Sequence, residues 1–366
     1  MTAQRLHREP AALRAAASEA WLRPACLIVG VAVLCYLPFV LSDRAIFGIR
    51  LSNMQLLNVG LTQVNLMLIT LLGALSLNYL TGVAGLVSIG NAAFYAVGAI
   101  VGAIAGTQWQ LPFPVVLIAS ALVGAVVGAI AGLPSLRVRG LYFVLSTFAL
   151  HYIVVFLVSE YQFRFFGVVG IPFEEASFGG FVLDTPVRWY FFLLVVCVLV
   201  YLGLRNSLRA REGRALMALR DNELAASAAG IDVRILRLKV FAFSSAIAAV
   251  AGTLFSYYMT NVNAEFFSIN FAIQFVAIII VGGMGSLAGS VVGAAVWLLL
   301  PAVINGFASQ AGSTGSALDR ILSESKPQLV NLTFGALVLL LLIFAPAGLS
   351  GIGRGLRDRF SGGRSS

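Results

Sequence analysis

The residues with the clearest chemical potential lie in one polar segment, residues 205 to 239, which interrupts an otherwise apolar sequence. The segment holds eight of the chain's 24 basic residues and four carboxylates. Within it, the run DNELAASAAGID predicts a short helix with both ends marked. Asp221 is placed to accept the first free backbone N–H groups, Glu223 lies where the helix dipole favours an anion, and Gly230 suits the left-handed conformation that ends a helix. Asp232 is placed to cap the helix that follows. The pattern indicates a docking site, and the alternative is an ordinary amphipathic surface helix.

The chain lacks the residue patterns of common active sites. Its two lysines, Lys239 and Lys326, do not follow glycine in a GK[ST] phosphate loop, so no ATP-hydrolysing site is predicted. There is no HExxH motif, and Ser88 in GLVSIG lacks the GxSxG spacing of a nucleophilic serine. The three cysteines lie in apolar runs without CxxC spacing. The sequence therefore predicts neither an enzyme nor a cofactor or metal site in this chain.

Composition places the polar segment in a membrane protein. Hydrophobic residues make up 60% of the 366 residues and charged residues 11%, whereas soluble domains carry about a quarter charged residues. The net charge of +9 comes from basic residues beside apolar spans and not among stacking aromatics. We therefore interpret these residues as orienting the chain in a membrane and predict no nucleic-acid partner.

Ten apolar segments are long enough to cross about 30 Å of hydrocarbon as helices. The predicted fold is all-α and polytopic, with a transmembrane domain over residues 25–345. The segments lie near residues 25–41, 55–79, 90–106, 112–132, 141–159, 187–204, 238–259, 269–284, 288–306 and 329–345.

The basic residues predict the orientation of these spans. With the N-terminus in the cytoplasm, 18 of the 24 basic residues fall on the cytoplasmic side and six on the outer side. Such a bias marks the cytoplasmic face. We therefore predict a cytoplasmic N-terminal tail at 1–24, a cytoplasmic C-terminal tail at 346–366 and a cytoplasmic loop at 205–239. No small-residue cleavage site follows the first apolar run, so we interpret it as a span and not as a signal peptide.

The predicted membrane interior is almost free of charge. All fifteen carboxylates fall in loops or tails, and His151 is the one ionisable side chain well inside a predicted span. Ion-driven carriers usually keep a buried charge, so this pattern disfavours one. The candidates for a solute path are His151 and neutral polar residues in or beside the spans, and the alternative is that they hydrogen-bond between helices. These neutral candidates are Asn65, Asn78, Ser88 and Asn91.

Glycines recur at four-residue spacing in two spans. The two sets are Gly98, Gly102, Gly106 and Gly124, Gly128, Gly132. Glycine on one helix face allows close helix contact in lipid, so we expect tight packing. The alternative is a pore-lining face on which the missing side chains leave room for a solute.

Two further glycine-rich stretches, residues 81–91 and 281–289, fall at predicted cytoplasmic turns. Aligned on their glycine pairs, they resemble each other loosely, which hints at an internal duplication of the kind found in transporters. Both could bring non-helical backbone to membrane depth, which is tolerated where the backbone is buried or faces a cavity.

Four stretches, in order, resemble the LivM-type permease subunits of branched-chain amino acid ABC importers. They are YLTGVAGLVSIGNAAFYAVGA, LPSLRVRGLYFVLSTFAL, GRALMALRDNELAASAAGIDVRILRLKVFAFSSAIAAVAGTLFSYY and VAIIIVGGMGSLAGSVVGA, and APAGLSG is similar to the family's terminal Pro-x-Gly-Leu. The resemblance runs from about residue 55 to residue 351. Within it, Glu223, Ala225, Ala226 and Gly230 match the EAA…G signature through which importer permeases meet their ATPase subunits.

This resemblance implies an assembly in the bacterial inner membrane. Its other members are a second, LivH-like permease, two cytoplasmic ATPase subunits that bind ATP and Mg, and an extracytoplasmic solute-binding protein. The implied solute is a branched-chain or related amino acid. The outer segment 160–186 departs from the Thr-Gly-Gly pattern of relatives, at a surface that suits an outside partner.

The resemblance also implies roles for the short helix. Glu223 is expected to bind a basic or N–H group of the ATPase, Ala225 and Ala226 to allow close approach, and Gly230 to set the exit angle. The alternative function is a stand-alone channel or ion-coupled carrier for a small neutral solute such as urea or an amide. The missing buried charge argues against a carrier, and the docking helix argues against a channel.

Overall fold

The computed structural model describes residues 60–138, 140–178 and 180–311, and single positions between 332 and 351. The predicted span at 25–41, the tail at 1–24 and most of residues 329–366 lie outside this part, so the count of ten spans and the location of the termini stay predictions. The elements in the described part are α2 (Leu61–Leu77), η2 (Asn78–Val83), α3 (Asn91–Gly102), η3 (Ala103–Gln108), α4 (Phe113–Gly132), η4 (Leu133–Leu136), α5 (Leu141–Phe166), η5 (Gly167–Val169), β1 (Ile171–Pro172), β2 (Ser177–Phe178), β3 (Phe181–Val182), α6 (Pro186–Arg209), α7 (Arg211–Asp221), α8 (Glu223–Ala228), α9 (Val233–Met259), β4 (Asn261–Val262), η6 (Ala264–Phe267), α10 (Ile269–Gly282) and α11 (Leu287–Ala311).

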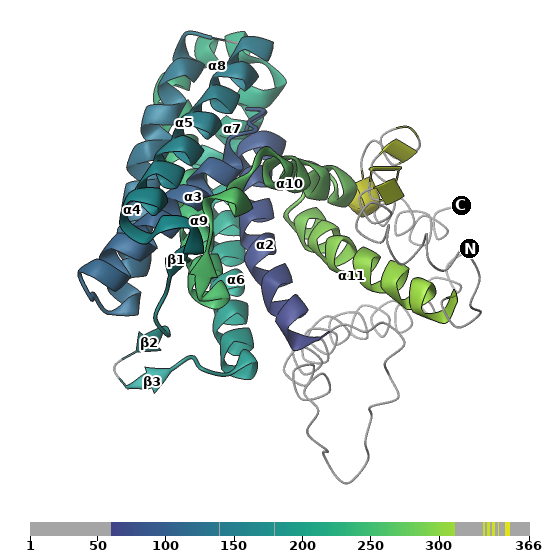
Figure 1. The fold of residues 1–366 in the computed structure, drawn as a ribbon. Helices are drawn as coiled ribbons and strands as arrows, with labels where there is room; N and C mark the ends of the chain where they lie inside the picture. The colour runs from purple at the N-terminus through teal and green to yellow at the C-terminus, as the bar shows by residue number, and fades with distance from the viewer. Residues whose placement is uncertain are drawn as a thin grey trace, which may run out of the picture. The chain divides into compact units, whose positions relative to one another are not determined.

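Five helical stretches in the described part of the chain are long and apolar enough to cross a membrane. They confirm the prediction of a helical, polytopic membrane protein, and helices dominate the ribbon in Figure 1. The five are Leu61–Val83, Phe113–Leu136, Leu141–Val169, Pro186–Arg209 and Val233–Met259.

The region predicted as two crossings near 269–284 and 288–306 has a different form. Helices α10 and α11 are joined by a short break and bent by 117°, which gives a broken span or a re-entrant loop. Helix α10 has 14 residues, so at 1.5 Å per residue it is about 21 Å long and shorter than the hydrocarbon layer. The cause is the glycine turn itself, where Gly283 and Gly285 adopt φ values of 113° and 83° that end the helix.

Helices α2 and α9 form the centre of the described part. In the most apolar window of each span, 83% of the residues of α2 are buried and 56% of those of α9, against 28–33% for α4, α5 and α6. Helix α4 shows the opposite faces of a peripheral span. It buries Ser120, Gly124 and Gly128 and exposes large apolar side chains four residues apart, as expected beside membrane lipid. These exposed side chains are Ile118, Leu122, Val126 and Ile130.

The predicted outer segment, residues 160–186, contains helix and short paired strands. Helix α5 continues to Phe166, and β1 then pairs antiparallel with β4, with Ile171 opposite Val262. Strands β2 and β3 form a two-residue hairpin whose turn includes Gly180 at φ 105°. In Figure 1 this hairpin lies at the end of the helices opposite to α7 and α8.

Candidate coupling site

The polar segment folds almost entirely into helix. Helix α6 runs five residues beyond the predicted span, α7 and α8 follow, and α9 begins at Val233, ahead of the predicted residue 238. Helix α7 is amphipathic, because it buries Leu216 and Leu219 while its charged residues are exposed. The helices therefore hold α8 in a defined position against the spans.

Helix α8 is capped at both ends, with one correction to the prediction. Its N-cap is Asn222, whose Oδ1 accepts from the backbone N–H groups of Leu224 at 3.0 Å and Ala225 at 3.1 Å. Asp221 was predicted for this role, but it is still the last helical residue of α7. A cap must be extended, and Asn222 is the residue that has that backbone, with φ −159° and ψ 111°.

The C-terminal end of α8 matches the prediction. Gly230 has φ 81°, its N–H bonds to the carbonyl of Ser227 at 3.0 Å, and the N–H of Ile231 bonds to the carbonyl of Ala226 at 3.2 Å. These two bonds form a Schellman motif, which a residue with a Cβ would strain. Asp232 then caps α9 as predicted, by accepting from the N–H groups at 234 and 235.

Glu223 faces the body of the protein. Its Oε2 lies 2.9 Å from Nη2 of Arg237 on α9, and its side chain is 25% exposed. The other terminal nitrogen of Arg237 donates to the carbonyl of Ser135 at 2.6 Å, and the Arg237 side chain is only 10% exposed. One buried guanidinium thus joins α8, α9 and η4, the short helix that ends α4. Arg237 could not be predicted from the sequence, because nothing local distinguishes it from the other arginines of the segment.

The two alanines of the signature point in different directions. Ala226 is buried at 3% exposure, whereas Ala225 is exposed. Beside Ala225, Leu224 is 73% exposed and stands in a polar stretch of the chain. An exposed large apolar side chain in such a setting suits contact with another protein. The outward face of α8 therefore presents Leu224 and Ala225, and its inward face presents Glu223 and Ala226.

A second arginine connects α7 to both glycine-rich turns. Nη1 of Arg220 donates to the carbonyl of Gly82 at 2.5 Å. Its side chain also covers Gly85 and Gly285, since a Cβ added at either glycine would lie 3.1 Å or less from Arg220. Gly85 and Gly285 lie in the two glycine-rich stretches at 81–91 and 281–289, and both have positive φ, 73° and 83°.

Asn78 holds the two turns together. Its Nδ2 donates to the carbonyl of Ser286 at 2.8 Å and to Oγ of Ser290 at 2.7 Å, and its Oδ1 accepts from the N–H of Gly285 at 2.7 Å. The side chain is fully buried. All of its hydrogen-bonding groups are therefore engaged between α2–η2 and the α10–α11 turn, as in a structural clamp.

Both sets of glycines at four-residue spacing, 98 to 106 and 124 to 132, pack against α9. A Cβ added at Gly98 would overlap the carbonyl of Ala249, and one added at Gly128 would overlap the side chain of Ser245. From the other side, a Cβ at Gly252 of α9 would overlap the backbone of Tyr95 on α3. The packing interpretation is thus confirmed, and the pore-lining alternative is wrong for these faces. Helix α9 lies between α3 and α4 and touches both at backbone distance.

The other predicted path residues are also buried. Asn91 accepts from Oγ of Ser76 at 3.1 Å and donates to the carbonyl of Gly73 at 3.3 Å, and Oγ of Ser88 accepts from the N–H of Gly90 at 3.2 Å. These bonds connect α2 with α3 and brace the start of α3. The polar candidates at this end therefore have hydrogen-bonding roles between and within the elements.

Two path candidates keep a buried polar atom without a hydrogen-bond partner among the described residues. Nδ2 of Asn65 donates to the carbonyl of Pro186 at 2.8 Å, but its Oδ1 has no such partner. His151 is 1% exposed, and its Nδ1 has none either. In the described part of the chain, the cavities beside Tyr79, Gly85 and Gly167 have none of the five path candidates in their lining.

Comparisons with known proteins agree with this arrangement. The model of the family described as branched-chain amino acid transport system / permease component matches residues 60–346. The chain is 32% identical over 245 residues to the high-affinity branched-chain amino acid transport system permease protein LivM of Escherichia coli (strain K12), over 60% of this chain and 58% of that protein. It is 31% identical over 299 residues to the protein of the same name from Salmonella typhimurium (strain LT2), over 75% of this chain and 66% of that protein.

An archaeal relative is similar as well. The chain is 29% identical over 222 residues to the probable branched-chain amino acid transport permease protein LivM of Methanocaldococcus jannaschii, over 59% of this chain and 62% of that protein. The chain spans less than two thirds of the length of these relatives. No solved structure matches the chain significantly. Because the family model covers well over half of the chain, the chain belongs to the branched-chain amino acid transport system permease component family.

Proposed function

We propose that this chain is a permease subunit of an ABC importer and that it moves a branched-chain or related amino acid across a bacterial inner membrane. Two cytoplasmic ATPase subunits bind and hydrolyse ATP with Mg, a LivH-like permease completes the membrane pathway, and an extracytoplasmic binding protein delivers the solute. The transport of branched-chain amino acids for which the relatives are named supports the solute class and the transport role. The observation that carries the proposal is a capped surface helix, α8, joined by a buried arginine to the central span α9.

In this mechanism α8 and α9 move as one body. The outward face of α8, with Leu224 and Ala225, sits in a cleft of the ATPase. Closure of the ATPase pair displaces α8, and Arg237 carries the displacement into α9 and the end of α4. Glycines bring α3 and α4 into close contact with the backbone of α9. Because helices packed this closely leave little room for side chains to rearrange, α3 and α4 move together with α9. Arg220 carries the motion of α7 to the two glycine-rich turns.

The solute path remains a proposal with unequal support. Asn65 and His151 keep unpartnered polar atoms among the described residues, which suits contact with a passing solute. Asn78, Ser88 and Asn91 already donate or accept hydrogen bonds between elements, which supports a role in helix contact.

The proposal is tested by uptake into liposomes. The complete complex is reconstituted with ATP trapped on the ATPase side, and radiolabelled L-leucine uptake is measured with the binding protein outside. We expect uptake with ATP and none with the non-hydrolysed analogue. Liposomes that hold this chain alone should take up neither leucine nor urea. Uptake by the chain alone would favour the channel or carrier instead.

The exposed leucine on α8 gives a direct test of docking. Leu224→Ala should weaken binding of the ATPase subunits by about ten- to thirtyfold, because burial of the lost methyl and methylene groups contributes roughly 1.5–2 kcal/mol. The affinity is measured with purified ATPase subunits and the permease pair in nanodiscs.

The matched control is Leu199→Ala, which removes another strongly exposed leucine, 64% against 73% for Leu224, from the apolar surface of α6. It should leave ATPase binding unchanged. Equal affinities for the Leu224→Ala and native complexes would show that this face of α8 is not the docking surface.

A further inference from the structure

A cavity of about 550 Å³ opens where the coupling helices meet the spans. Its walls come from η2, α4, α6, α7 and α9, so it lies beside the polar segment on the predicted cytoplasmic side. The volume is within the range of small-molecule sites, roughly 300–1,000 Å³. None of the residues predicted to form the solute path lines this cavity.

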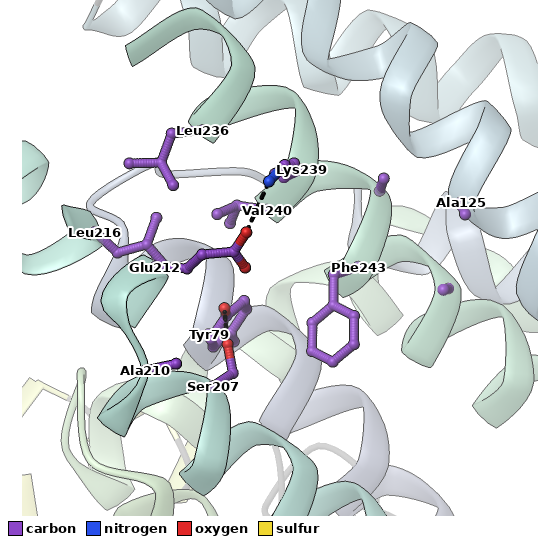
Figure 2. A pocket seen from close by; sticks show the side chains of 12 residues that line it. Tyr79, Ala125, Ser207, Ala210, Glu212, Leu216, Leu236, Lys239, Val240 and Phe243 are labelled. Carbon is purple, nitrogen blue, oxygen red and sulfur yellow. Dashed lines mark hydrogen bonds and ion pairs between the residues drawn. The ribbon is translucent and has the colours of Figure 1, made fainter. Parts of the chain in front are cut away.

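One side of the cavity carries a balanced pair of charges. Nζ of Lys239 lies 2.7 Å from Oε1 of Glu212, and the two side chains are 58% and 56% exposed. The hydroxyls of Tyr79 and Ser207 lie 2.7 Å apart next to them. Figure 2 shows the ion pair and the hydroxyl pair directed into the same space. An ion pair this exposed is weak, so a ligand that offers both charges can replace it.

The remaining wall is apolar. Leu216, Leu236 and Val240 are buried behind the charges, whereas Phe243 is 43% exposed and turns its ring toward the cavity. Figure 2 shows the Phe243 ring beside the Tyr79–Ser207 pair. Ala246, about one turn further along α9, also lines the cavity. The cavity therefore has a charged end of both signs and an apolar end.

This arrangement selects one class of ligand. A bare anion would satisfy Lys239 and repel Glu212, and a bare cation would do the reverse. An α-amino acid carries an ammonium and a carboxylate on one carbon, so its two charges match a lysine and a glutamate that are already in contact. An apolar side chain on that carbon would then lie against Phe243.

We propose that this cavity binds a zwitterionic amino acid with an apolar side chain, as the release-side station of the transported solute. The ammonium of the ligand pairs with Glu212, its carboxylate with Lys239, and its side chain packs on Phe243 and Ala246. The proposal rests on the proposed transport function. It adds that solute binding breaks a contact between two helices, because Glu212 lies on α7 and Lys239 lies on α9.

The test is equilibrium binding of radiolabelled L-leucine to the nucleotide-free complex in nanodiscs, without the binding protein. We expect saturable binding that glycine, 4-methylpentanoate and isoamylamine compete for at least tenfold less well, because each lacks the side chain or one charge. Lys239→Gln and Ala246→Phe should each weaken leucine binding at least tenfold. Arg234→Gln, on an exposed arginine of the same helix outside the cavity, is the matched control and should not.

Uptake measured on the same preparations separates this proposal from the proposed function. ATP-driven leucine uptake by the native complex without leucine binding at this cavity would overturn the site and leave the function standing. If the native complex takes up no amino acid, the proposed transport function is wrong. If leucine does not bind, and mass spectrometry finds a phospholipid that Lys239→Gln releases, the cavity is a lipid site and the proposal is wrong.

Discussion

Replacing Arg237 by alanine is expected to lower ATP-driven solute uptake at least about tenfold while ATP hydrolysis by the assembled complex continues. The substitution removes the ion pair to Glu223 and the hydrogen bond to the carbonyl of Ser135. Breaking a buried ion pair costs about 3–5 kcal/mol, and the lower end applies because Glu223 keeps contact with water. Without this connection α8 moves with the ATPase, but α9 no longer follows. Uptake and ATP hydrolysis are measured on the same proteoliposomes.

The control for this prediction is Arg234→Ala, three residues earlier on α9. Arg234 is exposed, so its removal lowers the local positive charge by the same amount without breaking the connection. Its uptake should stay within about twofold of the native complex, as expected for a surface substitution. Full uptake by Arg237→Ala in an intact complex would show that the arginine does not transmit the motion.

Gly98→Leu is expected to prevent stable packing of α3 on α9. The Cβ of any other residue would overlap the carbonyl of Ala249, which is helix backbone and cannot swing aside. The helices must therefore separate, and overpacking of this kind costs about 3 kcal/mol or more. We expect a large fall in the melting temperature of the purified complex and loss of uptake.

Gly203→Leu is the matched control for Gly98→Leu. Gly203 lies within α6, and a Cβ added there meets nothing within 4 Å. Since glycine is a poor helix former, this substitution should leave the melting temperature unchanged or raise it slightly. A complex with Gly98→Leu that melts like the native one would contradict the account of α9 as the helix held between α3 and α4.

Local signals accounted for much of what the sequence predicted correctly. Gly230 and Asp232 were assigned to the ends of helices because a left-handed C-terminus and a side-chain cap depend on a few neighbouring residues. The error at the other end was one residue, since both Asp221 and Asn222 are good caps and only the backbone shows which is extended. The spans could also be predicted, because the length of an apolar run is a local property of the sequence.

Long-range contacts were beyond the sequence. The glycine spacing predicted helix contact, but it could not indicate that both sets of glycines meet α9. Asn78 has the polarity of a path residue, and its role as a clamp depends on Gly285 and Ser290, more than 200 positions away. Arg237 and Glu223 were both visible in the polar segment, yet their pairing requires the turn at Gly230 that brings the start of α9 back to α8.

The bend between α10 and α11 could not be predicted from the sequence, for a related reason. Two apolar runs separated by glycines fit two crossings as well as one bent unit, because hydropathy measures length and not direction. The structure has the break at Gly283 and Gly285, where Asn78 and Arg220 hold the turn. Contacts of this kind with distant side chains leave no pattern in the local sequence.

We propose that the energy of ATP hydrolysis enters this chain through α8 and reaches α9 through the Glu223–Arg237 ion pair. A double-mutant cycle on ATP-driven leucine uptake tests it most directly, with Glu223→Gln, Arg237→Gln and the combined variant in the reconstituted complex. We expect each single variant to lose uptake and the combined variant to be no worse than Arg237→Gln alone, because both changes break the same connection. Losses that multiply in the combined variant would show that the two residues act independently and that the ion pair does not transmit the motion.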